Sequence, residues 1–390
     1  MSIYIDLLKL EGHEEGGYFA IFYKSSDKVV PLNDRYSQIE SGQNIEKHQY
    51  VERNASSSIY FLLEKQGFSA WHRLKSDEIW HYYDGGSPID IHVIDHDGQL
   101  KLYTLGNPSL IEDAAFQIVI KAGVWFAAEV RDKSSFGLMG CTVSPAFEYH
   151  DFELAKLYRD QLIKLYPELI NIIDRLIKPQ VMSSSYQTND HVIALSKSKF
   201  SADDYIKKLK LEKHQEGGFF SLNYKSTDVV VPLDSRYRNS GRERDEPHRF
   251  AGSSIYYLLD KDDFSAWHRL KSDEIWHYYD GGSPIDIHVI DHDGQLKTYG
   301  LGNPLLNKNA SFQVIIKAGV WFAAEVHDKE SFGLIGCTVS PAFEYGDFVL
   351  VNRKNLVLQY PEHEIIINKF TRIELSSDDS WAHKLLIRRV

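Results

Sequence analysis

The chain has 390 residues, of which 43% are hydrophobic and 25% are charged, a composition typical of globular proteins with room for two domains of ordinary size. Acidic residues outnumber basic ones by 55 to 44, and the formal net charge is -11. Because no block of lysine and arginine could follow a phosphate backbone, we expect no nucleic-acid partner. The sequence also shows no secretory leader and no apolar run of membrane-spanning length, so we expect a cytoplasmic protein without membrane association.

The predicted elements of the first half begin with a short amphipathic helix at residues 3–10. Eight segments then combine β-branched and aromatic residues with flanking Gly, Pro, Asp or Ser, which is typical of strands. They are residues 56–63, 68–74, 78–83, 88–95, 100–105, 116–122, 124–130 and 136–143. Asp151 is a candidate N-cap for a helix whose apolar face runs from Leu154 to Tyr166 and which ends near Pro167. Eight or more strands predict a closed barrel or a jelly roll.

The second half repeats the first. Residues Phe68 to Lys101 recur without change at Phe264 to Lys297, and a second short helix is expected at residues 203–211. About five residues are missing from the second copy, and we expect this difference to be confined to a loop at residues 38–57. The repeat predicts two superposable domains of the mainly β class. A recent duplication would leave the same identity, so the repeat alone does not indicate function.

The domain boundaries follow from where the repeats begin and end. We expect the first domain at residues 1–178 and the second at residues 202–368. The segment between them, residues 179–201, is polar, rich in serine and weakly periodic, which is typical of a linker. Residues 369–390 form a C-terminal tail.

A candidate site comes from strand alternation around the second strand of the identical tract. Period-two alternation places His72 and Leu74 on one face, and Glu78, Trp80 and Tyr82 together on one face of the next strand. If His72 and Glu78 both point into the barrel, an imidazole and a carboxyl group meet in an aromatic cavity. Burial there would raise the pKa of the carboxyl group and allow acid/base chemistry. We expect the two side chains to lie within direct or one-water contact.

The same residues resemble a known family motif. The run from Gly67 through His72, Leu74 and Glu78 to Gly85 is similar to the first motif of the cupins, and Lys121 to Phe126 resembles the second motif. The further strings Glu15-Gly16-Gly17, Trp125-Phe126-Ala127-Ala128 and Gly140-Cys141-Thr142-Val143 resemble the fifth cupin family, a branch catalogued as a domain of unknown function. Nearly all of both copies is covered by this resemblance.

The resemblance implies two tandem cupin (jelly-roll) barrels with short flanking helices. Its members are often dimeric and are structurally similar to sugar epimerases and germin-like proteins, without an established reaction to transfer. We therefore expect the two barrels to pair within the chain, and further homo-oligomerisation stays open. In metal-binding cupins the motifs supply four ligands, but here Leu74 and Phe126 occupy two of those positions. Since a transition metal needs about three protein ligands, we expect no metal and no other cofactor.

The candidate residues form two matching sets. The candidate catalytic residues are His72, Glu78 and Tyr82 with their counterparts His268, Glu274 and Tyr278. The candidate ligand-binding residues are Glu15, Tyr18, Trp80 and Phe126 with their counterparts Glu216, Phe219, Trp276 and Phe322. Each has a structural alternative: the aromatic residues could only fill the barrel, and Glu15-Gly16-Gly17 could be only a strand-entry turn.

Other titratable residues favour structural roles. His81 is out of phase with Glu78 and is interpreted as a core or interface histidine. His92 and His96 fall in a strand and its following turn, where exposure is the default. Cys141 and Cys337 lie among strand-forming residues, outside any Cys-x-x-Cys pair, and are interpreted as buried reduced thiols.

Two functions of different classes remain open. The first is a metal-independent isomerase or epimerase acting on a sugar or related carbonyl metabolite, in which Glu78 or His72 removes a proton and Tyr82 returns one. The second is a module that binds or senses a small metabolite without catalysis. A metal-dependent cupin oxygenase ranks third because of the missing ligands.

Overall fold

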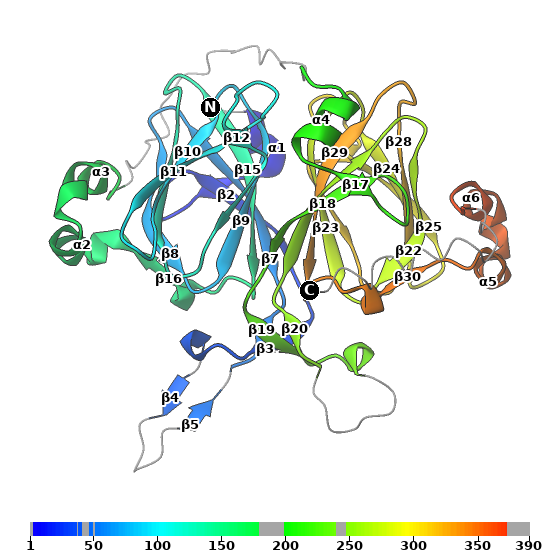
Figure 1. Cartoon of the computed structure of the whole chain (residues 1–390), viewed down its shortest axis with the longest axis horizontal. Coiled ribbons are helices and arrows are strands. Elements are labelled where there is room, and N and C mark those ends of the chain that lie inside the picture. The colour runs from blue at the N-terminus through cyan, green and yellow to red at the C-terminus, as the bar shows by residue number, and fades with distance from the viewer. Residues whose placement is uncertain are drawn as a thin grey trace.

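The computed structural model describes residues 3–36, 38–40, 47–49, 51–178, 199–238 and 247–372. Most of the predicted linker, the tail beyond residue 372 and part of the loop at residues 38–57 lie outside these residues. Within them, two β-barrels stand side by side, and a pair of helices covers the outer flank of each (Figure 1). No helix in the described part of the chain is long and apolar enough to cross a membrane.

Two six-stranded sheets form the first barrel, which contains all eight strand segments expected from the sequence. The first sheet has the order β1 (Glu11–Gly12), β2 (Tyr18–Lys24), β7 (Ser57–Glu64), β15 (Phe136–Ser144), β9 (Asp77–Gly85) and β13 (Gln117–Ile120). The second has the order β12 (Ala114–Ala115), β11 (Leu100–Leu105), β10 (Ile89–Ile94), β14 (Trp125–Val130), β8 (Phe68–Leu74) and β16 (Phe152–Leu154).

The second barrel repeats this topology strand for strand, as the internal repeat predicts. Its first sheet has the order β17 (Glu212–Lys213), β18 (Phe219–Lys225), β21 (Ser253–Leu259), β29 (Gly333–Ser340), β23 (Asp273–Gly281) and β27 (Gln313–Ile316). Its second sheet has the order β26 (Ala310–Ser311), β25 (Leu296–Leu301), β24 (Ile285–Ile290), β28 (Trp321–Val326), β22 (Phe264–Leu270) and β30 (Phe348–Leu350).

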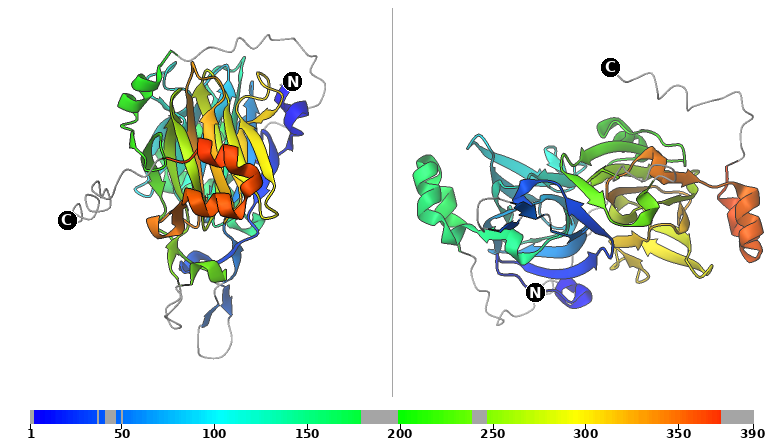
Figure 2. Two further views of the ribbon diagram at one scale, coloured as in Figure 1. Left: turned by 90° about the vertical axis from the view of Figure 1, so that its right-hand side faces the viewer. Right: turned by 90° about the horizontal axis from the view of Figure 1, so that it is seen from below.

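Short helices surround the barrels. The α-helices are α1 (Ile3–Leu8), α2 (Arg159–Leu165), α3 (Ile170–Arg175), α4 (Ala202–Lys208), α5 (Arg353–Gln359) and α6 (Glu364–Lys369). The 3₁₀ turns are η1 (Asp34–Tyr36), η2 (Tyr149–Asp151), η3 (Ala155–Leu157), η4 (Pro167–Leu169), η5 (Ser235–Tyr237), η6 (Tyr345–Asp347) and η7 (Pro361–His363). Helices α2 and α3 cover the outer face of one sheet, where Trp71 and Ile173 join one apolar cluster, and α5 and α6 do the same around Trp267 (Figure 2).

The predicted helix starting at Asp151 was wrong in its first part. The carboxylate of Asp151 is buried and accepts hydrogen bonds from Arg53 at 2.7 and 3.0 Å, so it caps no helix. The chain then forms β16 and η3, and the helix begins only at Arg159. An ion pair with a distant arginine therefore outweighs the local capping preference, which sequence spacing alone does not reveal.

A third sheet joins the two barrels. It has the order β20 (Arg249–Phe250), β19 (Val229–Pro232), β3 (Lys28–Pro31) and β6 (Arg53–Asn54), and its central pair β19–β3 contains one strand from each copy. A separate hairpin of β4 (Gln38–Glu40) and β5 (Lys47–Gln49) lies within the longer loop of the first copy. Apolar side chains of both copies also share one cluster, in which Tyr60 and Tyr83 of the first copy meet Phe312 of the second. The two barrels are thus in extensive contact.

Candidate functional site

A cavity of about 690 Å³ opens inside the second barrel, within the size range of pockets that bind small metabolites. Its polar lining residues include His214, Glu216, His268 and Glu274, together with Lys225, Ser253 and Glu344, and its aromatic walls include Phe220, Tyr257, Trp276 and Phe348. In the first barrel, the residues that correspond to the first four are His13, Glu15, His72 and Glu78, and their contacts match those of the second barrel, as follows.

The histidine of β8 is anchored by the backbone and by an aromatic ring. Nδ1 of His72 lies 2.7 Å from the carbonyl oxygen of Ala70, which only a protonated Nδ1 can satisfy, so the neutral ring leaves Nε2 unprotonated. Phe126 pairs with His72 across β14 and β8, and the two ring centroids lie 4.0 Å apart. Burial lowers the pKa of His72, although Glu15 acts in the opposite direction. The imidazole is therefore a neutral base with a fixed tautomer.

Glu15 lies between two histidines. Its Oε2 is 3.5 Å from Nε2 of His72 and 3.4 Å from Nδ1 of His13, and its Oε1 accepts a hydrogen bond from Ser69 at 2.8 Å. Burial alone would raise the pKa of this carboxyl group, but the two histidines and Ser69 outweigh burial and lower it. In the second copy the same arrangement lowers the pKa of Glu216 to about 2. The carboxylate is thus ionised and can stabilise a proton on His72.

Glu78 has the opposite character. It is buried, and its Oε2 has no hydrogen-bond partner among the described residues; the same holds for Nε1 of Trp80. Burial raises the pKa of Glu78 to about 8, an effect that the nearby Trp80 N–H partly offsets and the charge of Glu15 reinforces. The counterpart Glu274 also has a pKa of about 8. At neutral pH this carboxyl group is therefore protonated and can donate to a ligand.

In the second barrel, the structure brings together most of the predicted site residues. Glu216, His268, Glu274 and Trp276 all line the cavity. His72 and Glu78 both face the barrel interior, but Nε2 of His72 lies 3.5 Å from Oε2 of Glu15. The direct partner of this histidine is therefore the carboxylate of the N-terminal strand-entry turn. Phe322 does not line the cavity, but its ring packs on that of His268 with 3.9 Å between centroids.

Two pairs of predicted site residues lie away from the cavity lining: Tyr82 with Tyr278, and Tyr18 with Phe219. The hydroxyl of Tyr82 donates to the carbonyl oxygens of Gly85 and Ser87, and Tyr278 makes the equivalent bonds, so these phenols brace a turn. Tyr18 and Phe219 each pack in an apolar cluster that contains residues of both copies, because alternation along β2 and β18 turns the next residue to the barrel interior. It is Phe220 that lines the cavity, and its counterpart is Phe19.

The sequence reasoning missed several residues of the site. His13 and His214 flank the glutamate of the N-terminal turn, and Phe152 packs against His72 with 5.3 Å between ring centroids. The motif His13-x-Glu15 recurs as His214-x-Glu216, and this recurrence was the available signal. Cys337 also lines the cavity, but burial raises the pKa of its thiol, which remains protonated.

The turn at Glu15-Gly16-Gly17 combines the two roles considered for it, a strand-entry turn and the placement of a carboxylate. Gly17 adopts φ +69°, and a Cβ at this position would lie 2.8 Å from the carbonyl oxygen of Leu62. Only glycine fits there without displacement. The turn directs the buried side chain of Glu15 into the barrel, where its backbone carbonyl also accepts from Ala70 at 2.7 Å. The glycines therefore permit the backbone path that places the carboxylate.

The donor set does not fit a transition metal. Within the described residues, no group of three or more His, Cys, Asp or Glu side chains is arranged to hold a metal ion. The ring of Phe126 packs directly on His72, and Leu74 is buried on the same strand, so neither position supplies a ligand. The carboxylate of Glu15 is a possible metal ligand, but its oxygens already contact two histidines and a serine.

Comparison with known proteins finds a family whose model matches most of the chain. The model of the family Cupin_5, described as Cupin superfamily (DUF985), matches residues 2–155 and 203–351. No curated protein matches the chain.

Among solved structures, protein SO0799 from Shewanella oneidensis is 34% identical, covering 45% of this chain and 99% of its own, with a TM-score of 0.38. A hypothetical protein from Leishmania major is 28% identical, covering 45% and 100%, with a TM-score of 0.39. Oxalate decarboxylase from Lactobacillus farciminis, in a formate complex, is 11% identical over 88% of this chain and 96% of its own, with a TM-score of 0.44.

Proposed function

Because the chain belongs to the Cupin_5 (DUF985) family of the cupin superfamily, with two copies of its barrel, we propose that each barrel binds a small oxygen-rich metabolite and transfers a proton next to its carbonyl group. The reaction class is a metal-independent isomerisation or epimerisation. The observation that carries this proposal is a pair of buried carboxyl groups that line one cavity and have pKa values displaced in opposite directions, raised for Glu274 and lowered for Glu216; Glu78 and Glu15 show the same displacements. Such a divergence assigns one carboxyl group as the acid and the other as the anion that stabilises a protonated histidine base.

The ligand class follows from the cavity walls. Oε2 of Glu274 and the N–H of Trp276 are buried and have no hydrogen-bond partner among the described residues, which favours a ligand that presents oxygen acceptors to them. The aromatic walls of Phe220 and Phe348 favour the apolar faces of a ring. A sugar or a related hydroxy-carbonyl compound supplies both.

In the proposed reaction, Glu78 donates to the carbonyl oxygen of the ligand while His72 Nε2 removes a proton from the neighbouring carbon. The electron pair of the broken C–H bond forms an enediol, whose oxygen keeps the proton from Glu78. The imidazolium is stabilised by ionised Glu15 at 3.5 Å. If His72 returns the proton to the former carbonyl carbon, Glu78 regains a proton from the hydroxyl group on the neighbouring carbon, which becomes the new carbonyl group, and the product is the isomer. If the enediol first turns over in the cavity, His72 returns the proton to the other face of the original carbon and Glu78 regains its proton from the enediol oxygen, which gives the epimer.

The test begins with a thermal-shift screen of free sugars, nucleotide sugars and small carboxylates, since ligand at 100 times its Kd adds about 2.7 kcal/mol of stability. Wild type should then exchange a carbon-bound proton of a hit for solvent deuterium, as measured by NMR. The double variant Glu78→Gln with Glu274→Gln should bind equally well and exchange at least ~10²-fold more slowly.

The matched control changes two other buried carboxyl groups. Glu129→Gln with Glu325→Gln removes carboxylates that pair with His92 and Lys329 outside the cavity, so exchange should persist. A hit that binds wild type but shows no exchange would reject the enzyme and leave the second candidate, a metabolite-binding module. The unpartnered donors Glu274 and Trp276 also favour that candidate, because binding alone would satisfy them.

A further inference from the structure

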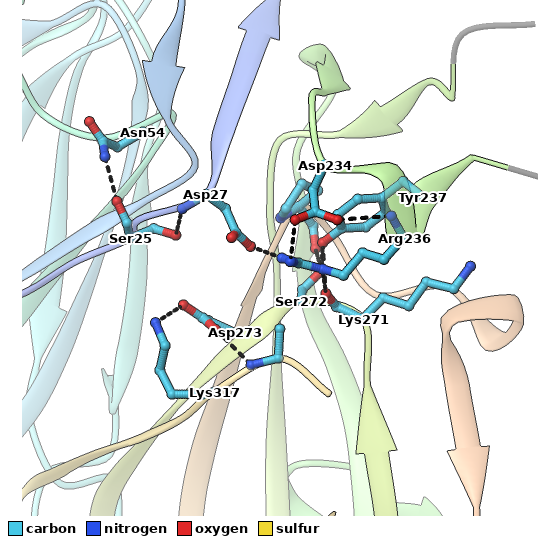
Figure 3. A network of polar contacts seen from close by, with 12 residues as sticks. Ser25, Asp27, Asn54, Asp234, Arg236, Tyr237, Lys271, Ser272, Asp273 and Lys317 are labelled. Carbon is cyan, nitrogen blue, oxygen red and sulfur yellow. Dashed lines mark hydrogen bonds and ion pairs between the residues drawn. The ribbon is translucent and has the colours of Figure 1, made fainter. Parts of the chain in front are cut away.

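A three-residue turn precedes the proposed acid in each barrel. In the second barrel it is Lys271 to Asp273, immediately before Glu274, and Asp273 is its anchor. One carboxylate oxygen of Asp273 accepts from the backbone N–H of Ala318 at 2.7 Å, and the other pairs with Lys317 (Figure 3). The same contacts hold Asp77 before Glu78. The start of β23 and of β9 is therefore fixed by one buried aspartate.

The opposite barrel supplies a further contact to this aspartate. Tyr23, from the first copy, donates its hydroxyl to Oδ2 of Asp273 in the second copy. Reciprocally, Tyr224 of the second copy donates to Oδ2 of Asp77 at 2.7 Å. Both tyrosines are buried. Each acid-bearing strand thus begins at a carboxylate held by a hydroxyl from the other barrel.

A second route crosses the interface to the same turn. Nε of Arg236 donates to the carbonyl oxygen of Lys271 at 2.6 Å, and its guanidinium group pairs with Asp27 of the first copy (Figure 3). In the mirror arrangement, Arg35 donates to the carbonyl oxygen of Lys75 and pairs with Asp228 of the second copy. Two independent contacts therefore connect each turn with the opposite barrel.

An irregularity in the strand produces this geometry. The register between β2 and β7 shifts between Ile21 and Tyr23, and that between β18 and β21 shifts between Leu222 and Tyr224. Without the bulge, alternation would place Tyr23 on the face opposite Phe22, which packs toward the second barrel. The bulge turns Tyr23 to the interface, a common role of such irregularities next to functional sites.

We propose that Tyr23 and Tyr224 are positioning residues that act crosswise, each holding the acid-bearing strand of the opposite barrel in place. The inference rests on the proposed function, because it takes Glu78 and Glu274 as the acids. A separate barrel would lack one hydroxyl and one ion pair at its turn. The complete site therefore requires two copies, either tandem copies in one chain or two chains of a single-copy protein.

The test follows the two carboxyl groups directly in the full chain, without a ligand. Infrared difference spectra between wild type and Glu274→Gln across pH isolate the carboxyl band of Glu274, and Glu78→Gln isolates that of Glu78. In Tyr23→Phe, the loosened turn should admit water to Glu274 and lower its titration midpoint by about one pH unit, with no change at Glu78. Tyr224→Phe should give the reverse result.

Two other tyrosines provide controls. Tyr60→Phe removes a hydroxyl that bonds to Ser311 across the same interface at 3.0 Å but contacts neither turn, so neither midpoint should move. Tyr36→Phe removes a hydroxyl that bonds to Lys75 within its own barrel at 3.0 Å, so only Glu78 should respond.

A Tyr23→Phe variant that leaves the Glu274 midpoint unchanged, or that shifts Glu78 more than Glu274, would overturn the crosswise role. If Tyr23→Phe does not fold, Asp27→Asn tests the second route. This variant should lower the titration midpoint of Glu274 without moving that of Glu78. An unchanged Glu274 midpoint would again overturn the proposal. Failure of deuterium exchange in wild type would reject the proposed reaction but would not affect these shifts.

Discussion

Two buried glutamates in the first barrel, Glu15 and Glu78, show how environment decides chemical role. Glu15 accepts a hydrogen bond from Ser69 and lies beside His13 and His72, and the pKa of its carboxyl group is lowered. Glu78 is equally buried but has apolar and aromatic surroundings, and its pKa rises to about 8. The same side chain is therefore an anion at one position and an acid at the other.

The raised pKa of Glu78 and Glu274 predicts a loss of stability as pH rises from about 4.5 to about 8. Between the ordinary value of 4.5 and about 8, the unfolded chain is ionised while the folded chain keeps both protons, so stability falls as pH rises through this window. Each group contributes a slope of up to about 1.4 kcal/mol per pH unit. Chemical denaturation at pH 7.0 and ~8.0 should show a smaller decrease for Glu78→Gln with Glu274→Gln than for wild type.

The control for this pH dependence is Glu129→Gln with Glu325→Gln, whose carboxyl groups have lowered pKa values and are ionised in both states throughout this range. Its decrease should equal that of wild type. Equal decreases for wild type and the Glu78/Glu274 double variant would show that these carboxyl groups are ionised in the folded protein.

At the scale of elements, strands β9 and β23 have both faces buried. One face of β9 carries Glu78 and Trp80 toward the barrel interior, and the other carries His81 and Tyr83 toward the second barrel. Alternation therefore assigns the faces but not what covers them. The pair β3 and β19 completes the contact, with Val29, Ala55, Val230 and Ala251 in a small apolar cluster drawn from both copies.

This cluster predicts a measurable cost for shortening one valine. Val230 is buried to 1% exposure in the cluster, so Val230→Ala should lower the free energy of unfolding by about 1–2 kcal/mol. Val349→Ala is the control, because this valine is 41% exposed and should change stability by less than about 0.5 kcal/mol. Chemical denaturation measures both. If Val230→Ala lowers the free energy of unfolding as little as Val349→Ala does, the apolar cluster at the β3–β19 pair contributes little to stability.

At the scale of the whole molecule, a pair of histidines lies between the barrels. His81 and His277 stack with ring centroids 3.7 Å apart and planes 6° from parallel. Nδ1 of His81 bonds to the hydroxyl of Tyr279 at 2.7 Å, and Nδ1 of His277 bonds to that of Tyr83 at 2.8 Å. Burial lowers the pKa of His81 to about 3, and it also lowers that of His277 well below its ordinary value, with His81 adding to the effect.

The stacked pair predicts acid sensitivity. Below the ordinary histidine pKa of 6.5, the unfolded chain takes up protons that the folded interface excludes, so stability falls as pH decreases from 6.5 toward about 3. Each ring contributes up to about 1.4 kcal/mol per pH unit. Thermal unfolding at pH ~6.5 and ~5.0 should show a smaller decrease for His81→Asn with His277→Asn than for wild type.

The exposed histidines of the two Asp-Gly turns provide the control. His96→Asn with His292→Asn should keep the wild-type pH dependence, because these rings stay in solvent. A His81/His277 double variant as acid-sensitive as wild type would indicate that other groups cause the loss of stability.

The sequence by itself determined the duplicated mainly β architecture, because strand composition, turn residues and an unchanged repeat are local properties. It also determined that Glu78 and Trp80 share a face, since alternation has a fixed period of two. Only the tertiary structure decided that His72 contacts Glu15, because the N-terminal turn is distant in sequence and joins β8 through space. Likewise, the bulge that turns Tyr23 toward Asp273 depends on pairing with β7 and on the second barrel, so local sequence patterns did not reveal it.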